Sequence, residues 1–236
     1  MEKPELLNIS QENLPKHIAF ILDGNGRWAI KHGFIRTIGH EKGVKTLKNI
    51  TKLVKELGIP FMSVYAFSVE NWSRPKDEVE YLIDKAYNEF KHYEKNLSKL
   101  DFNIRIVGET TNLPTKVLEV ITKINNNIFI QDRFTLMIAF NYSSQLELIH
   151  AAKEMKRRKL AFTKENLEKC LYTYPAPPID LLIRTSGEQR LSNYMLYQAS
   201  YAELYFPKTF WPAFNKKELY KALEEYSKRQ RRFGKV

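Results

Sequence analysis

The sequence contains a single cysteine, Cys170, among its 236 residues. This scarcity excludes a disulfide framework and a thiolate zinc site within one chain. Long apolar runs are also absent: none exceeds five residues, whereas a membrane-spanning helix needs about 20. The first residues lack the basic start and apolar stretch of a secretory signal. We therefore expect a cytoplasmic protein without a transmembrane segment.

Linkers rich in glycine and serine, internal repeats and low-complexity segments are missing too, so we expect one domain over residues 1–236. Short apolar runs alternate with segments whose apolar residues recur at helical spacing. This alternation is typical of an α/β fold with a mainly parallel sheet, here of six strands, flanked by helices. The expected strands are 17–22, 61–67, 102–107, 134–140, 179–183 and 201–206, and the expected helices are 39–57, 77–100, 114–127, 143–158 and 215–232.

Acidic residues are outnumbered, because 38 lysines and arginines face 27 aspartates and glutamates and leave a net charge of +11. A basic surplus suggests an anionic partner: a nucleic acid, an acidic membrane surface or a phosphorylated small molecule. The surplus alone does not choose among them.

Ligands of parallel sheets bind beyond the carboxyl ends of the strands, and the loop after the first expected strand is rich in polar groups. It contains Asp23, two glycines around Asn25, and Arg27. Glycines let backbone N–H groups approach an anion, and the guanidinium of Arg27 is a donor for phosphate. The plainer alternative is a tight turn with an N-cap aspartate.

Two further loops follow strand ends and add cationic groups. Residues 68–75 combine polar and aromatic side chains with Arg74, and the loop after 179–183 has Arg184 and Arg190 separated by hydroxyl residues. Arg184 could instead only pair with a neighbouring carboxylate. Taken together, the loops predict a site for one or two diphosphates with Mg²⁺, for which Asp23 and Glu203 offer oxygen ligands.

The residues of these loops resemble those of the cis-prenyltransferases, and most of all the bacterial undecaprenyl diphosphate synthases. The similar segments follow the family's order through nearly the whole chain. They are HIAFILDGNGRW (17–28), GHEKG (39–43), YAFSVENWSRP (65–75), DLLIRTSGEQRLS (180–192), YAELYF (201–206), WP (211–212) and RRFG (231–234).

This resemblance implies an enzyme that condenses isopentenyl diphosphate repeatedly onto farnesyl diphosphate. Its product would be undecaprenyl diphosphate, the precursor of the glycan carrier lipid for cell-wall synthesis. The fold would include a hydrophobic tunnel for the growing chain, and α-helical residues 79–97 could supply one wall. The family also implies Mg²⁺, a homodimer in which Arg231 and Arg232 reach the partner's site, and a loose membrane contact for product release.

Each motif carries over a set of expected roles. Asp23 and Asn71 would be catalytic, and Asp23 and Glu203 would hold the metal. The expected substrate-binding residues are Gly24, Asn25, Gly26, Arg27, Trp28, Arg36, His40, Ser68, Val69, Glu70, Trp72, Arg74, Arg184, Arg190, Leu191 and Ser192.

The chain departs from the family pattern at a few positions. Ser186 replaces a common glycine, Gln189 stands where many members have histidine, and Ser143–Gln145 replaces a Gly-Gly-Arg stretch. These changes leave open a catalytically silent subunit of a heteromeric prenyltransferase. A nucleic-acid-binding protein would also explain the charge, but no recognisable motif supports it, so we expect no nucleic-acid partner. The six aspartates include no adjacent pair, which argues against the helical trans-prenyltransferases and their DDxxD motifs.

Overall fold

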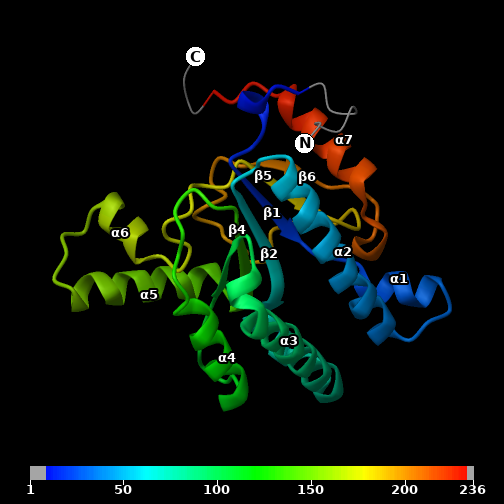
Figure 1. Ribbon diagram of the computed structural model, residues 1–236, viewed down its shortest axis with the longest axis horizontal. Helices are drawn as coiled ribbons and strands as arrows, with labels where there is room; N and C mark the ends of the chain where they lie inside the picture. The colour runs from blue at the N-terminus through cyan, green and yellow to red at the C-terminus, as the bar shows by residue number, and fades with distance from the viewer. Residues whose placement is uncertain (1–8, 233–236) are drawn as a thin grey trace. The chain divides into compact units, whose positions relative to one another are not determined.

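The computed structural model describes residues 9–232 and contains one six-stranded sheet (Figure 1). The strand order is β3-β4-β2-β1-β5-β6, and the neighbours β1–β5, β5–β6 and β3–β4 run parallel. This confirms the predicted α/β class with a mainly parallel sheet. The strands are β1 His17–Ile21, β2 Phe61–Ser68, β3 Asn103–Val107, β4 Thr135–Tyr142, β5 Leu181–Arg184 and β6 Glu203–Tyr205.

The helices flank this sheet along the described part of the chain. They are α1 Asn25–Lys31, α2 Arg36–Glu56, α3 Lys76–Asn96, α4 Thr115–Asn125, α5 Ser144–Arg157, α6 Lys164–Cys170 and α7 Lys216–Ser227. Short 3₁₀ helices are Gln11–Asn13, Val69–Ser73, Leu97–Lys99 and Trp211–Ala213.

Two expectations for local structure need correction. Residues 23–28 are not simply a tight turn, because α1 begins at Asn25 directly after Gly24. The helix has only 7 residues, too few for an apolar period to stand out, and the glycines at its start, Gly24 and Gly26, favour a turn. The closing helix ends at Ser227 rather than at 232.

Contacts within the chain divide it into two compact units. The first unit includes residues up to Ser63, Pro177–Ser192 and the chain from Tyr197 onward, and the second includes Val64–Ala176 and Asn193–Leu196. A single domain over the whole chain stays a prediction, and each unit is described by itself.

The core of the first unit forms around Trp211, which is fully buried. Its ring centroid lies 5.7 Å from that of Phe20 in β1 and 5.6 Å from that of Phe214. Its indole N–H donates to the carbonyl oxygen of Gly43 over 2.9 Å, which ties α2 to the segment before α7. All five residues of β1 are buried, so the end of this strand has a fixed position within the unit.

Aromatic side chains also form the core of the second unit. The rings of Tyr65 and Tyr194 stack with centroids 4.5 Å apart. Phe140 of β4 contacts Phe67 of β2 and Phe90 of α3, at 5.4 and 5.2 Å between centroids. These contacts fix the carboxyl end of β2, where the 68–75 loop begins. Across residues 9–232, no helix is long and apolar enough to cross a membrane.

His17 is a buried polar residue at the start of β1. Its Nε2 lies 2.6 Å from the hydroxyl of Ser63, and its Nδ1 lies 2.8 Å from the carbonyl oxygen of Pro177. A neutral ring satisfies both contacts, with Nδ1–H donating and Nε2 accepting. Burial lowers the pKa of His17 to about 4 and outweighs the opposite effects of the Pro177 hydrogen bond and of Asp180.

We expect His17 to make the fold sensitive to mild acid. Since its pKa is depressed in the folded state, the unfolded chain binds the proton first as the pH falls from about 6.5 towards 4. The free energy of unfolding should therefore fall by about 3 kcal/mol more in the wild type than in His17→Gln over that range. Urea titrations of both proteins at several pH values measure this difference, and parallel pH profiles would contradict the assignment.

Candidate active site

The first group of predicted site residues follows β1. The backbone of Asp23 is held on two sides, because its carbonyl oxygen accepts from the hydroxyl of Thr185 over 2.7 Å and from the N–H of Trp211 over 3.0 Å. Gly24 follows with a φ of 100°, and a Cβ there would lie 2.6 Å from the Phe210 ring. Only glycine fits this turn, which begins α1 and aims the Asp23 side chain.

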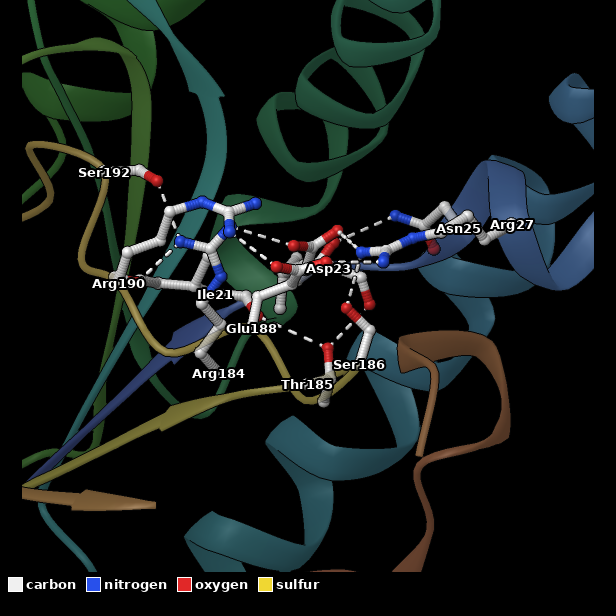
Figure 2. A network of polar contacts seen from close by, with 11 residues as sticks. Ile21, Asp23, Asn25, Arg27, Arg184, Thr185, Ser186, Glu188, Arg190 and Ser192 are labelled. Atoms are coloured by element: carbon white, nitrogen blue, oxygen red, sulfur yellow. Dashed lines mark hydrogen bonds and ion pairs between the residues drawn. The ribbon is translucent and has the colours of Figure 1, made fainter. Parts of the chain in front are cut away.

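An ion-pair network joins the end of β1 to the loop after β5 (Figure 2). One carboxylate oxygen of Asp23 accepts from Arg184 and the other accepts from Arg27, both over 2.9 Å. Arg27 also donates to Glu188 over 2.6 Å and to the hydroxyl of Ser186 over 2.7 Å. Arg190 donates to the second oxygen of Glu188 over 2.5 Å. Three guanidinium groups thus share two carboxylates, which leaves one positive charge in excess.

The members of this network differ in exposure. Only 6% of the Arg184 side chain is exposed, against 23% for Asp23 and 45% for Arg27. Partial burial raises the pKa of Asp23, but hydrogen bonds from Arg184 and Arg27 outweigh it and hold the pKa below its usual value. The carboxylate is therefore charged at neutral pH, next to exposed cations.

Arg184 is the most constrained of the three arginines. Besides its bond to Asp23, it donates to the carbonyl oxygen of Arg190 over 2.6 Å and to the hydroxyl of Ser192 over 2.8 Å. The predicted pairing of Arg184 with a carboxylate is confirmed, and Arg184 also organises the loop that contains Arg190, Leu191 and Ser192, while its role in phosphate binding stays a prediction.

Residues of α1 and α2 extend this group. Arg36 begins α2, and its guanidinium carbon lies 3.0 Å from the position that a Cβ on Gly26 would take. His40 is four residues further along and shares that face of α2. Asn25 donates to the carbonyl oxygen of Leu22 over 3.2 Å, and the Trp28 ring stacks with that of Phe34, with centroids 6.2 Å apart.

Glu203 and Asp23 do not come together within the chain. Glu203 begins β6 and is paired with Leu181, which is itself paired with Ile18 of β1. Asp23 lies five residues beyond Ile18, past the carboxyl end of β1 at Ile21. The carboxylate of Glu203 accepts from Arg229 over 2.9 Å. No cluster of three or more metal-ligating side chains occurs among the described residues.

The contact of Arg231 and Arg232 with a partner subunit's site stays a prediction. Arg231 donates to Asp180 of its own chain over 2.5 Å and to the hydroxyl of Tyr226 over 3.2 Å. Arg232 is exposed, and the last two residues of the RRFG segment lie outside the described part.

A second group of predicted site residues lies in the second unit, after β2. The amide oxygen of Asn71 accepts from the N–H of Ser68 over 3.0 Å, as part of a capping box that fixes the 3₁₀ helix Val69–Ser73. Arg74 donates to Glu78 over 3.0 Å. The loop is therefore ordered by its own side chains.

Two asparagines that we had not singled out hold this loop in place. Asn141 accepts from the indole N–H of Trp72 over 2.8 Å, and Asn193 donates to Glu70 over 3.0 Å. Burial raises the pKa of Glu70, but the Asn193 bond and hydrogen bonds within the loop lower it by more. Both asparagines have positive φ values, 52° and 61°, which asparagine tolerates better than most residues. A single sequence gives no signal for this role.

We expect the branched guanidinium group of Arg184 to contribute more to the free energy of unfolding than its positive charge alone. Arg184→Lys keeps the charge but cannot reach all three acceptors, so unfolding should need about 2 kcal/mol less free energy. Arg190→Lys, at a side chain that is 59% exposed, should change stability by less than about 0.5 kcal/mol. Urea denaturation of the two variants provides the comparison. Equal losses in the free energy of unfolding would show that the guanidinium shape of Arg184 is unimportant.

Comparisons with known proteins show which family the sequence resembles over its whole length. The family model described as putative undecaprenyl diphosphate synthase matches residues 21–234. The chain is 44% identical to an isoprenyl transferase of Fusobacterium nucleatum, over 96% of this chain and 98% of that protein. It is 39% identical to the (2E,6E)-farnesyl-diphosphate-specific ditrans,polycis-undecaprenyl-diphosphate synthase of Haemophilus influenzae, over 97% and 99% of the two chains.

A solved structure extends the agreement to the fold. Lavandulyl diphosphate synthase from Lavandula x intermedia, in complex with dimethylallyl diphosphate, superimposes with a TM-score of 0.85 at 29% identity. The match covers 95% of this chain and 100% of the other. The motifs, the fold and the full-length similarity all lead to one conclusion: the chain belongs to the undecaprenyl diphosphate synthase family of cis-prenyltransferases.

Proposed function

We propose that this cis-prenyltransferase condenses isopentenyl diphosphate onto farnesyl diphosphate at the Asp23–Arg184 network, with Mg²⁺. The observation that carries the proposal is the charge arrangement, in which three arginines surround two carboxylates and two of the arginines are substantially exposed. Such a site offers several N–H donors to phosphate oxygens and retains a net positive charge.

The arginines would act where charge develops. When the allylic carbon–oxygen bond breaks, negative charge accumulates on the departing diphosphate, and fixed guanidinium groups stabilise it without reorganisation. From the family motifs we assign Arg27, Arg36 and His40 to the allylic diphosphate. We assign Arg184, Arg190 and Ser192 to isopentenyl diphosphate. Arg184 is suited to this because Asp23 and two loop oxygens already fix its plane.

Asp23 is the residue that would hold the metal. Mg²⁺ is commonly bound through one or two carboxylates together with substrate phosphates, and Asp23 is a charged carboxylate beside the arginines that would bind those phosphates. The ion would neutralise part of the leaving-group charge. The sequence predicts that Glu203 shares this role. However, Glu203 pairs with Arg229 and lies away from Asp23 along the strands. We therefore propose Asp23 as the carboxylate that this chain supplies to the metal at this site.

Asn71 would assist removal of the proton from isopentenyl diphosphate. An amide is too weak a base to take the proton itself, so its part would be to orient the group that does. Support comes from the capping box, which holds its amide oxygen on the Ser68 N–H and so fixes the side chain. Trp72 and Glu70, held by two asparagines, would define the neighbouring surface.

The length of the product would depend on an apolar tunnel. Each buried CH₂ of a growing chain contributes about 0.8 kcal/mol, so a long product stays bound while unfilled apolar surface remains. The apolar side of α3, with Val79, Ile83 and Phe90 buried, is a candidate wall. The same residues also serve as ordinary core, and the two roles are compatible. We further propose a cytoplasmic homodimer that releases its product at a membrane.

The first experiment is an activity assay with purified protein, farnesyl diphosphate, labelled isopentenyl diphosphate, Mg²⁺ and a little detergent. We expect a ladder of extractable products that ends near undecaprenyl length, and we expect chelation of the metal to abolish it. If the folded protein makes no labelled lipid alone but does so with a second subunit, the silent-subunit alternative is correct. Gln189 and Ser186 would then be the first positions to revert to the family residues.

Asp23→Ala tests the role of the carboxylate separately from binding. Turnover should fall about 1,000-fold, because a charge acting on the transition state is lost, while farnesyl diphosphate binding should change by less than about tenfold. Steady-state kinetics and calorimetric titration measure the two quantities. Asp84→Ala, at an exposed aspartate paired with Lys116, is the matched control and should change neither. An equal loss of turnover and of binding in Asp23→Ala would contradict the assigned role.

A further inference from the structure

The turn between α1 and α2 exposes three bulky apolar side chains in the space of six residues. Ile30 is 61% exposed, Phe34 is 50% exposed and Ile35 is 72% exposed. Figure 1 shows this turn at the outer end of the α1–α2 pair, where the two helices join. Clusters of exposed apolar groups are uncommon on soluble surfaces and mark sites of contact.

A line of lysines lies along the later part of α2. Lys45, Lys48, Lys52 and Lys55 are spaced by three, four and three residues, so they share one face of the helix. The opposite face holds the buried positions, among them Thr46, Ile50 and Val54. The lysines therefore point away from the core of the first unit.

The charge of α2 is strongly one-sided. The helix has six basic and two acidic residues, and one of the acidic residues, Glu56, pairs with Lys52 over 3.8 Å. With 21 residues, α2 is about 31 Å long. A flat, extended anionic surface matches this shape better than a small anion does.

We propose that the α1–α2 turn and the lysine face of α2 dock the enzyme onto a bilayer of anionic phospholipids. Ile30, Phe34 and Ile35 would enter the interface between headgroups and acyl chains, while the lysines would contact the headgroups. The docking itself needs no substrate; its purpose rests on the proposed function, because a long polyprenyl product must pass from the protein to a membrane.

The turn between α5 and α6 is the nearest competitor in the described structure. It exposes Phe162, at 79%, among basic residues. However, only one bulky apolar side chain is exposed there, against three near the α1–α2 turn. Its lysines 153, 156 and 159 are exposed, as are Lys45, Lys48 and Lys52 of α2, which makes this region a matched control.

Vesicle flotation of the full chain without substrate tests the proposal. Wild-type protein should float with vesicles that contain phosphatidylglycerol at low salt, and it should float poorly with phosphatidylcholine alone or at high salt. Each lysine near an anionic surface strengthens binding roughly fivefold, so Lys45→Gln/Lys48→Gln/Lys52→Gln should weaken binding about 100-fold. The control Lys153→Gln/Lys156→Gln/Lys159→Gln removes the same charge and should leave binding near the wild-type value.

The apolar part of the surface is tested in the same way. Ile30→Ser/Ile35→Ser should weaken vesicle binding by about tenfold or more, because about 0.8 kcal/mol is lost for each CH₂ withdrawn from the membrane. Ile128→Ser/Phe162→Ser removes two apolar side chains elsewhere that are more exposed than Ile30 and Ile35, and it should have little effect.

Several results would overturn the docking surface. The first is wild-type protein that does not float, and the second is an equal loss of flotation in the test and control variants. The third is a change of oligomeric state in Ile30→Ser/Ile35→Ser, measured by light scattering, which would assign the turn to a contact between copies. Synthase activity of the same variants in detergent is measured in parallel. Intact activity with lost flotation separates failure of docking from failure of the proposed function.

Discussion

The site depends on the ion pair between Arg184 and Asp23. A guanidinium that is almost fully buried needs a carboxylate nearby, because an unpaired charge in that position would cost several kcal/mol. Asp23 meets this need with one oxygen and holds Arg27 with the other. Since Arg184 also bonds to Ser192 and to the backbone of Arg190, the loop after β5 and the end of β1 share one geometry. Moving either member would disturb both loops.

The backbone around Asp23 is built to resist such movement. Thr185 and Trp211 hold its carbonyl oxygen, and Gly24 makes the sharp turn against Phe210. Trp211 is in turn fixed on α2 through the carbonyl of Gly43. The carboxylate is thus positioned by the buried core of the first unit rather than by a mobile loop, which is what precise placement of a catalytic group requires.

Much of this architecture could be predicted from the sequence, because hydrophobic period and strand ends carry strong signals. The apolar run within 17–22 predicts β1 and places Asp23 just after a strand, which the structure confirms, whereas the anion site indicated by Arg184 and Arg190 stays a prediction. The sequence pattern could not reveal α1, because the glycines at its start favour a turn. It also could not reveal that Asn141 and Asn193 hold the 68–75 loop, because this role depends on left-handed backbone and long-range contacts. Nor could it show that Glu203 lies far along the strands from Asp23, since that follows from the β5–β6 register.

The charge balance of the network explains why a diphosphate and a cation belong together at this site. In the free protein, two carboxylates accept four hydrogen bonds from three arginines, and one positive charge remains. A diphosphate carries several negative charges and would meet Asp23 and Glu188 at close range, so repulsion would cancel part of the attraction of the arginines. A divalent cation on Asp23 would offset that repulsion while Arg27 and Arg184 stay beside the phosphate oxygens. We therefore expect the same carboxylate that keeps Arg184 stable in the free enzyme to make diphosphate binding depend on metal.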